Sequence, residues 1–295
     1  MSEEWRSYES RPCYPAVGAA VVRGFDAAVR SLPAGPTVLA VDGPHVLDWG
    51  ALVTGFRRAV NDGLGIAVET RDVRDDFASW PDILARTSSA VLHGDPDFET
   101  IPDGDLRVCF DTVPAVPRPD RGVLVVYGPG AALLEHDVLW YADLPKRFAE
   151  AATIAGEVTN LGQRDGDGPA TTRRLFYVDW PLLDKHRDAL GPDVDRWLDT
   201  QDDAVVPSSL DGEGLRRTLT TLAAQPVRTR PTFNTTSWGG HWAQRELGMN
   251  QKARNTALGY ELIAPESGIL VGGPENRVEI PFQLLVANHP QQVLG

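Results

Sequence analysis

The chain carries, at residues 38–44, the stretch Val38-Leu39-Ala40-Val41-Asp42-Gly43-Pro44. Its apolar part begins at Thr37 and is closed by turn-forming residues, which is typical of a buried strand. A helix is predicted at 44–62, because proline is favoured in a first helical turn and apolar residues then recur at helical spacing: Trp49, Leu52, Val53, Phe56 and Val60. The sequence therefore predicts a strand, a loop and a helix in succession.

Segments of both kinds surround this unit. Apolar runs predict strands at 66–69, 106–110, 123–127, 138–141 and 174–179, and helical periodicity predicts helices at 16–32, 80–87, 145–155, 181–190 and 215–224. This alternation predicts an α/β fold with a parallel sheet covered by helices on both faces. Ligands of such sheets bind beyond the carboxyl ends of the strands, so we expect the chemistry in the loops there.

The texture of the sequence changes near residue 227. Short β-like runs at 260–264, 269–271 and 278–280 are separated by Pro265-Glu266-Ser267-Gly268 and Gly272-Gly273-Pro274, a pattern typical of antiparallel β structure. We therefore expect two parts, an α/β domain at 1–226 and a partial β-rich segment at 227–295, which stops before such a β domain could close.

Charge and composition exclude several classes of function. The chain has 295 residues and a formal net charge of -13, and a negative surface repels phosphate backbones and anionic lipid headgroups. We therefore expect no nucleic-acid partner and no membrane partner. Cys13 and Cys109 lie at no paired spacing, which fits a reducing compartment. With neither a signal-peptide pattern nor an apolar run of about 20 residues, we expect a cytoplasmic protein.

The loop after residue 41 has the layout of a phosphate-binding P-loop without its chemistry. Counted from Gly43, the positions of the Gly-Lys-Ser/Thr triplet hold Asp48, Trp49 and Gly50, so the Walker A motif is degenerate. Asp42, Gly43, His45 and Asp48 are candidates for binding a small ligand there. The alternative is purely structural: a strand-to-helix turn in which Trp49 belongs to the core and His45 and Asp48 serve the helix start.

Other pieces resemble nucleoside and nucleotide kinases of the uridine-kinase type, over about 36–224. The stretch 137–145 resembles their late strand that ends in an acidic residue and a proline. Arg147, Arg164 and Arg174 would line a phosphate-binding lid, since guanidinium groups suit phosphate oxygens; a solvated basic face is the alternative. Asp179-Trp180-Pro181 and Asp184-Lys185-His186-Arg187 form a polar and aromatic cluster suited to sugar-phosphate contacts or, equally, to a surface helix start.

The tail carries a second resemblance. Trp238-Gly239-Gly240, the following His241-Trp242 and the later Leu258-Gly259-Tyr260-Glu261 resemble the opening of the cupin domain of class I mannose-6-phosphate isomerases, over about 230–295. With a kinase-like segment upstream, the chain is similar to an actinobacterial type of that family. The resemblance implies aldose–ketose isomerisation of a hexose phosphate with the help of zinc, and it makes Trp238, His241 and Glu261 candidate ligand-binding residues.

The zinc site of that family has no counterpart here. Its Gln-x-His-Pro segment is missing, because His289-Pro290 lacks the glutamine, and no two of the six histidines lie at metal-ligand spacing. We expect no metal ligand and no cofactor in this chain, with zinc only if a separate cupin half supplies it. The expected partners are such a downstream half or a second copy of the chain, and a small-molecule sugar phosphate.

The expected function is therefore in sugar-phosphate metabolism, as a relative of mannose-6-phosphate isomerase that is inactive alone. One alternative is a kinase-like phosphotransferase of altered mechanism acting on a nucleoside or sugar. The other is a non-catalytic module that binds a sugar phosphate or a nucleotide.

Overall fold

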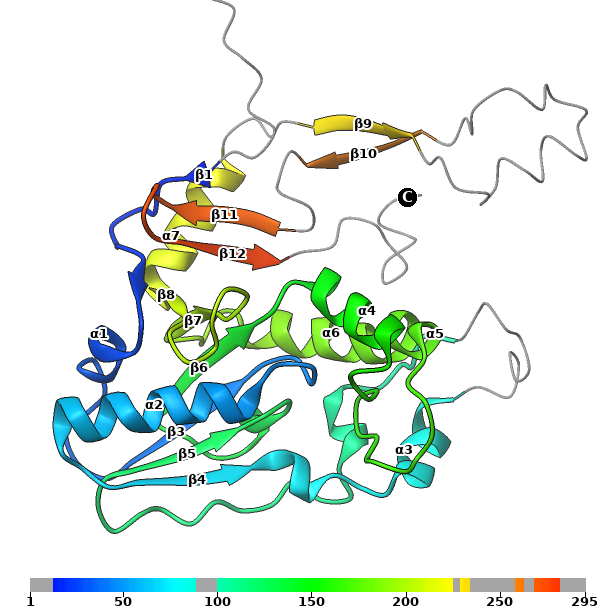
Figure 1. The fold of residues 1–295 in the computed structure, drawn as a ribbon, viewed down its shortest axis with the longest axis horizontal. Helices are drawn as coiled ribbons and strands as arrows, with labels where there is room; N and C mark the ends of the chain where they lie inside the picture. The colour runs from blue at the N-terminus through cyan, green and yellow to red at the C-terminus, as the bar shows by residue number, and fades with distance from the viewer. Residues whose placement is uncertain (1–12, 89–99, 225–228, 234–257, 263–267, 282–295) are drawn as a thin grey trace, which may run out of the picture.

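A computed structural model describes residues 13–88, 100–224, 229–233, 258–262 and 268–281. Its centre is a seven-stranded mixed sheet in the order β2-β8-β7-β6-β3-β5-β4 (Figure 1). The strands are β2 (Val22–Arg23), β3 (Thr37–Asp42), β4 (Val68–Asp72), β5 (Val123–Tyr127), β6 (Val138–Asp143), β7 (Arg196–Asp199) and β8 (Ser208–Asp211).

Five neighbouring strands, β7, β6, β3, β5 and β4, run parallel, as the alternating sequence predicted. β8 pairs antiparallel with β7, and β2 pairs antiparallel with β8. The sheet is therefore mixed at one edge. This antiparallel edge was not predicted from the sequence, because β7 and β8 are four residues each and end in polar side chains.

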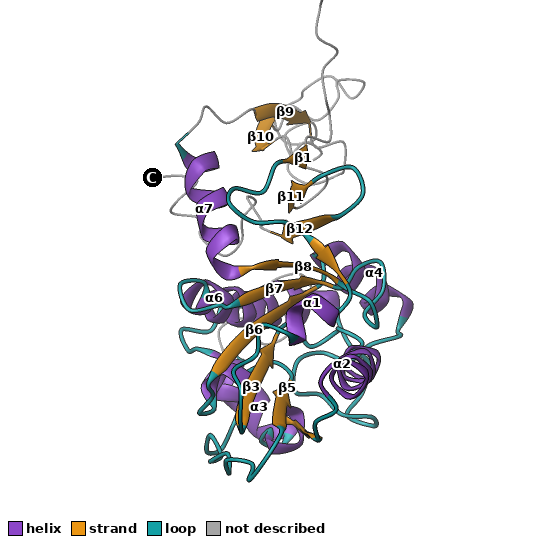
Figure 2. Ribbon diagram, turned by 90° about the vertical axis from the view of Figure 1, so that its left-hand side faces the viewer, coloured by secondary structure: helices purple, strands orange, loops and turns teal. Residues whose placement is uncertain are grey.

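The helices cover both faces of the sheet (Figure 2). Successive residues of a strand point to opposite faces, so Leu39 and Val41 pack with one set of elements and Val38 and Ala40 with another. The helical elements are α1 (Asp26–Val29), α2 (Trp49–Leu64), α3 (Trp80–Thr87), α4 (Lys146–Ala155), α5 (Thr172–Arg174), α6 (Trp180–Leu190), α7 (Gly212–Ala223), the 3₁₀ turns η1 (Val73–Asp76), η2 (Leu106–Cys109) and η3 (Ala131–Leu133), and the π-helical turn η4 (Leu175–Asp179).

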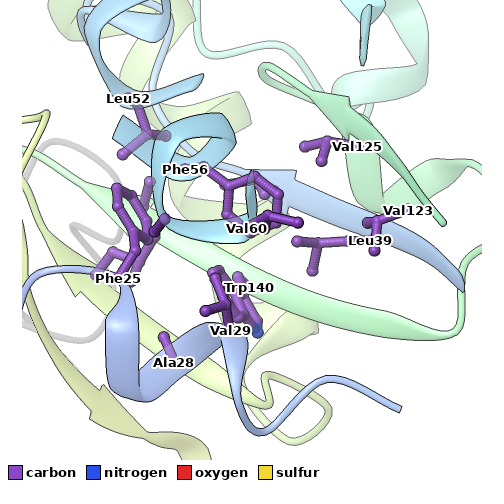
Figure 3. Packing of buried hydrophobic residues seen from close by; sticks show 14 of the residues in the cluster. Phe25, Ala28, Val29, Leu39, Leu52, Phe56, Val60, Val123, Val125 and Trp140 are labelled. Carbon is purple, nitrogen blue, oxygen red and sulfur yellow. The ribbon is translucent and has the colours of Figure 1, made fainter. Parts of the chain in front are cut away.

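The first face is covered by α1 and α2. Phe25, Phe56 and Trp140 contact one another there, with Phe56 set edge-on to the other two rings, and Leu39 and Val125 lie in the same cluster (Figure 3). Such close packing of aromatic rings contributes about 0.5–1.5 kcal/mol per pair beyond the area that it buries. This cluster fixes α2 against the sheet and with it the loop after β3.

Four predicted elements are wrong in type or extent. The helix predicted at 16–32 is reduced to α1, because Gly18 and Gly24 take positive φ values and β2 lies before it. The strand predicted at 106–110 is the 3₁₀ turn η2, capped by Asp105, and the strand predicted at 174–179 is helical, as part of α5 and η4. The helix predicted from residue 44 begins at Trp49, because the side chain of Asp48 caps it.

The tail forms antiparallel strand pairs, as its turn residues predicted. β9 (Thr229–Phe233) pairs with β10 (Leu258–Leu262), and β11 (Gly268–Gly272) pairs with β12 (Arg277–Pro281). β1 (Cys13–Tyr14) adds to β11 in parallel. Val271, Val278 and Ile280 pack into the cluster on the second face of the sheet, which α7 also joins. Among the helices of the described residues, none is long and apolar enough to cross a membrane.

Candidate functional site

The carboxyl ends of the parallel strands carry acidic residues. β3, β4, β6 and β7 end at Asp42, Asp72, Asp143 and Asp199. After β3 the chain first builds β4 and β5 on one side and then β6 and β7 on the other, so β3 is the topological switch point of the sheet. A crevice outside the strand ends forms at such a point, which makes the ends of β3 and β6 the candidate site.

The carboxylate of Asp42 binds the backbone amides of the loops beyond the end of β3. Its Oδ1 accepts hydrogen bonds from the backbone N–H groups of Gly43 at 2.7 Å and Gly130 at 3.3 Å. Its Oδ2 accepts from Ala132 N at 2.8 Å and lies 2.9 Å from His186 Nε2. The residue is 0% exposed. The amides that an anionic ligand could use at this point therefore bind a carboxylate of the chain itself.

The rest of the P-loop-like segment is structural. Gly43 packs so closely that an added Cβ would lie 2.1 Å from the carbonyl oxygen of Ala142. Asp48 Oδ1 accepts from Ala51 N at 2.9 Å and caps α2. Trp49 is 1% exposed, and its Nε1 donates to the carbonyl oxygen of Pro44 at 3.2 Å. The interpretation of this segment as a strand-to-helix turn with Trp49 in the core is confirmed.

His45 is buried in the same loop. Its side chain is 7% exposed, and neither ring nitrogen has a hydrogen-bond partner among the described residues. Nε2 lies 3.9 Å from Asp179 Oδ2. Burial lowers the pKa of His45 below its ordinary value, and the nearby Asp179 and the backbone of Thr159 only partly offset this. The imidazole is therefore neutral at pH 7, with one nitrogen that donates and one that accepts.

The three arginines expected to form a lid have different protein partners. Arg147 Nη1 and Nη2 donate to Glu279 Oε1 and Oε2 at 2.8 and 3.0 Å. Arg164 Nη2 donates to the carbonyl oxygen of Phe77 at 3.3 Å. Arg174 stacks on Trp80, with 4.6 Å from Cζ to the ring centroid, and its Nε lies 3.5 Å from Asp179 Oδ1. Their guanidinium groups thus hold parts of the chain together.

Asp143, at the end of β6, is the most unusual carboxyl group of the site. It is 6% exposed, and its Oδ1 accepts from Leu144 N at 2.7 Å. Its Oδ2 is buried and has no hydrogen-bond partner among the described residues. Burial raises the pKa of Asp143 to about 7, although Arg187 opposes that rise. The group therefore exchanges a proton near neutral pH, as a general acid or base would.

His45 and Asp143 line a small cavity that lies between the loop after β3, the end of β6, α4 and α6. Its volume is about 20 Å³, enough for one water-sized group, and it widens to about 390 Å³ when the open space in front is included. Apolar residues with Trp180 form much of the wall. The polar and charged residues that line it are His45, Asp143, Lys146, Asp184 and Arg187.

The cations of the cavity are held by Asp184. Lys146 Nζ donates to Asp184 Oδ2 and lies 5.0 Å from the centroid of the Trp180 ring. Arg187 Nη1 lies 3.5 Å from Asp184 Oδ1. Burial lowers the pKa of Lys146, and Asp184 offsets part of that effect. When Asp143 is protonated, the charged side chains of the cavity are Lys146, Arg187 and Asp184, so the net charge of the cavity is positive.

The predicted residues are thus only partly brought together. His45 lies in the cavity, Asp42 and Gly43 lie beside it, and Asp48 points to α2. The cluster predicted at 179–187 contributes Trp180, Asp184 and Arg187, whereas Lys146 was missed, because a single lysine after a proline carries no signal of its own. Asp143 belongs to the acidic strand end noted in the sequence, but nothing there shows that its second oxygen is unpaired.

The candidates in the tail lie largely beyond what the structure describes. Trp238 and His241 fall outside the described residues. Glu261 lies on β10, opposite Arg230 in the ladder with β9. Within the described ranges, no group of three His, Cys, Asp or Glu side chains could hold a metal ion.

Comparison with known proteins gives one family. Residues 24–224, more than half of the chain, match the model of a family described as "Domain of unknown function (DUF8485)". No curated protein matches the chain. The matched range contains every residue of the cavity.

Proposed function

This chain belongs to the DUF8485 family, and we propose that it is a non-catalytic module of sugar-phosphate metabolism, which binds a sugar phosphate and does not bind nucleoside triphosphates. In this proposal the α/β part is a degenerate P-loop-kinase-like domain and the tail is the start of a cupin-type segment related to mannose-6-phosphate isomerase.

One observation carries the proposal: the carboxylate of Asp42 occupies the backbone amides of Gly43, Gly130 and Ala132. A phosphate in the same place would lose those donors and face a negative charge, which costs about 4 kcal/mol at 4 Å and an effective dielectric constant of 20. Asp48 likewise accepts from the amide of Ala51 in the first turn of α2. The elements that bind a triphosphate in a P-loop are therefore occupied by the protein.

The sugar-phosphate class is supported by two further features. The tail sequence around Trp238-Gly239-Gly240 resembles the mannose-6-phosphate isomerases. The cavity at the switch point offers polar groups of both hydrogen-bonding kinds beside two cations, as a ligand with hydroxyl groups and a phosphate requires. Zinc and the partner that would supply it remain predictions, and no step here depends on them.

A thermal-shift assay with two ligands tests the proposal. Mannose 6-phosphate at millimolar concentration should raise the melting temperature, because binding to the folded state stabilises it, and ATP with Mg²⁺ should not. Incubation of the chain with mannose 6-phosphate should form no fructose 6-phosphate. The absence of any shift with mannose 6-phosphate would refute the module, and turnover would show an isomerase instead.

The strand order favours one alternative, the phosphotransferase of altered mechanism. A parallel sheet with its switch point at β3, followed by a loop and a long helix, is the layout that nucleotide-binding folds use. A shift with ATP and Mg²⁺, together with transfer of the γ-phosphate to a sugar or nucleoside, would establish this alternative over the module.

A further inference from the structure

Two unpaired polar groups face the same cavity from neighbouring strands. β3 and β6 are hydrogen-bonded in parallel, so the loop that carries His45 and the strand end that carries Asp143 lie side by side. Both side chains are more than nine-tenths buried and line the cavity. Within the described part of the chain, Asp143 Oδ2 has no hydrogen-bond partner, and neither nitrogen of His45 forms a hydrogen bond of good geometry, although the backbone of Thr159 lies close enough to act on the ring.

The other strand ends show that this is not the rule for the sheet edge. Asp42 uses both of its oxygens on backbone amides and His186. Asp199 accepts from Gln201 N and Nε2 and from Glu279 N, the last at 2.6 Å. Buried polar groups in folded proteins are almost always hydrogen-bonded, so an exception that faces a cavity calls for a partner from outside the chain.

The chemistry of the two groups defines that partner. A neutral imidazole offers one N–H donor and one acceptor, and a carboxylate accepts. A hydroxyl group can donate to Asp143 Oδ2 and accept from His45 at once, whereas a phosphate oxygen only accepts when it is fully ionised. The space of about 20 Å³ between the lining residues suits a single hydroxyl group.

We infer that the cavity binds a hydroxyl group of the ligand, which donates to Asp143 Oδ2 and accepts from His45, while the anionic part of the ligand lies toward Lys146 and Arg187. The inference rests on the proposed function for the identity of the ligand and assigns it a place in the fold. It makes Asp143 and His45 the residues that tell a sugar phosphate from inorganic phosphate.

Titration calorimetry with mannose 6-phosphate and with inorganic phosphate tests this site in the full chain. At pH 8, above the pKa of about 7 at which Asp143 ionises, Asp143→Asn keeps the shape but turns an acceptor into a donor, and we expect its dissociation constant for mannose 6-phosphate to rise roughly tenfold, as loss of one hydrogen bond to a charged group requires. His45→Gln should show a loss in the same direction. Glu157→Gln, at an exposed carboxylate just beyond α4, should bind like the parent chain.

The outcomes separate the site from the function. If the parent chain binds mannose 6-phosphate and both cavity variants bind it equally well, the site is wrong and the proposed function stands. If inorganic phosphate loses as much affinity as mannose 6-phosphate in Asp143→Asn, recognition of a hydroxyl group is overturned. If the parent chain binds no mannose 6-phosphate, the proposed function fails and this inference with it. Circular dichroism of each variant verifies that it is folded.

Discussion

At the scale of single residues, the site is governed by which carboxylates find partners inside the protein. Asp42 and Asp143 end adjacent strands and are both buried, yet one is fully hydrogen-bonded and the other keeps an unpaired oxygen. Hydrogen bonds therefore offset the free-energy cost of burying the carboxylate at the end of β3, whereas at the end of β6 one carboxylate oxygen is buried without such compensation. That difference gives each residue its own response to substitution.

Asp143 should make the protein less stable as pH rises. Its folded-state pKa of about 7 lies above its ordinary 3.8, so the folded chain holds a proton that the unfolded chain has lost. Stability should decline between about pH 4 and 7 and then level off. Asp143→Asn removes this loss and should exceed the parent chain in stability by about 2–4 kcal/mol at pH 8, with little gain at pH 4.

Urea denaturation of both chains across this pH range measures the difference. Glu157→Gln is the control for removal of one charge and should leave the pH profile unchanged. A gap between Asp143→Asn and the parent chain that is constant from pH 4 to pH 8 would contradict the assignment.

Substitution of Asp42 should lower the stability of the fold, whereas substitution of Asp143 should raise it. Asp42→Ala leaves three backbone amides and His186 without their acceptor, at about 1–3 kcal/mol for each buried group that water cannot reach. We expect a loss of at least about 3 kcal/mol in the free energy of unfolding. Chemical denaturation measures this loss. A loss below about 1 kcal/mol would show that the freed amides find other hydrogen-bond partners, which contradicts a fixed arrangement around Asp42.

At the scale of elements, two glycines of α2 allow the effect of tight packing to be measured separately from the effect of helix propensity. An added Cβ at Gly55 would lie 2.2 Å from the carbonyl oxygen of Val205, whereas at Gly63 the nearest atom is 3.9 Å away. Gly63→Ala should therefore stabilise the chain by about 0.5–1 kcal/mol, the usual gain of alanine over glycine in a helix.

Gly55→Ala should destabilise the chain despite the same propensity gain, because α2 must move away from the loop that contains Val205. Thermal melting of the two variants side by side gives the test. Equal effects from both substitutions would mean that α2 is not in close contact with that loop.

The sequence predicted elements well where one periodicity covered a whole segment. β3, β5, β6, α3, α4 and α6 were expected within a few residues, since each combines an apolar run or a periodic face with a clear stop. The strand predictions at 106–110 and 174–179 were wrong, because short apolar runs look alike in strands and in single helical turns. The candidate cavity lies at the edge of the sheet where the sequence predicted ligand binding, but pairing of carboxylates depends on amides far away in sequence, such as those of Gly130 and Ala132.

At the scale of the whole molecule, the tail is fastened to the carboxyl edge of the sheet by Glu279. Its buried carboxylate accepts two hydrogen bonds from Arg147, and its N–H donates to Asp199 Oδ2. Arg147, one of the expected phosphate-binding residues, thus binds an anion that the chain supplies. The Arg147 side chain is 30% exposed, so solvent screens the pair, and removal of one partner should cost less than the about 3–5 kcal/mol typical of a fully buried ion pair.

Glu279→Gln should therefore loosen the β11–β12 hairpin more than the sheet beneath it. Amide hydrogen exchange of residues 268–281 should become faster, while exchange in β3 and β5 should change little. Glu275→Gln, at an exposed position of the same hairpin, is the matched control. Equal acceleration in the hairpin and in the central strands would show that the hairpin and the sheet open as one unit.

The pairing of β1 with β11 has a consequence for how the protein is made. Cys13 and Tyr14 align with Leu270 and Val271, so residues near the beginning of the chain find their hydrogen-bonding strand only after most of the polypeptide has left the ribosome. Until then the first strand has no template, whereas the parallel strands can assemble from nearby segments. A polypeptide truncated before residue 268 would consequently leave the backbone N–H and C=O groups that β1 uses toward β11 without their strand partner.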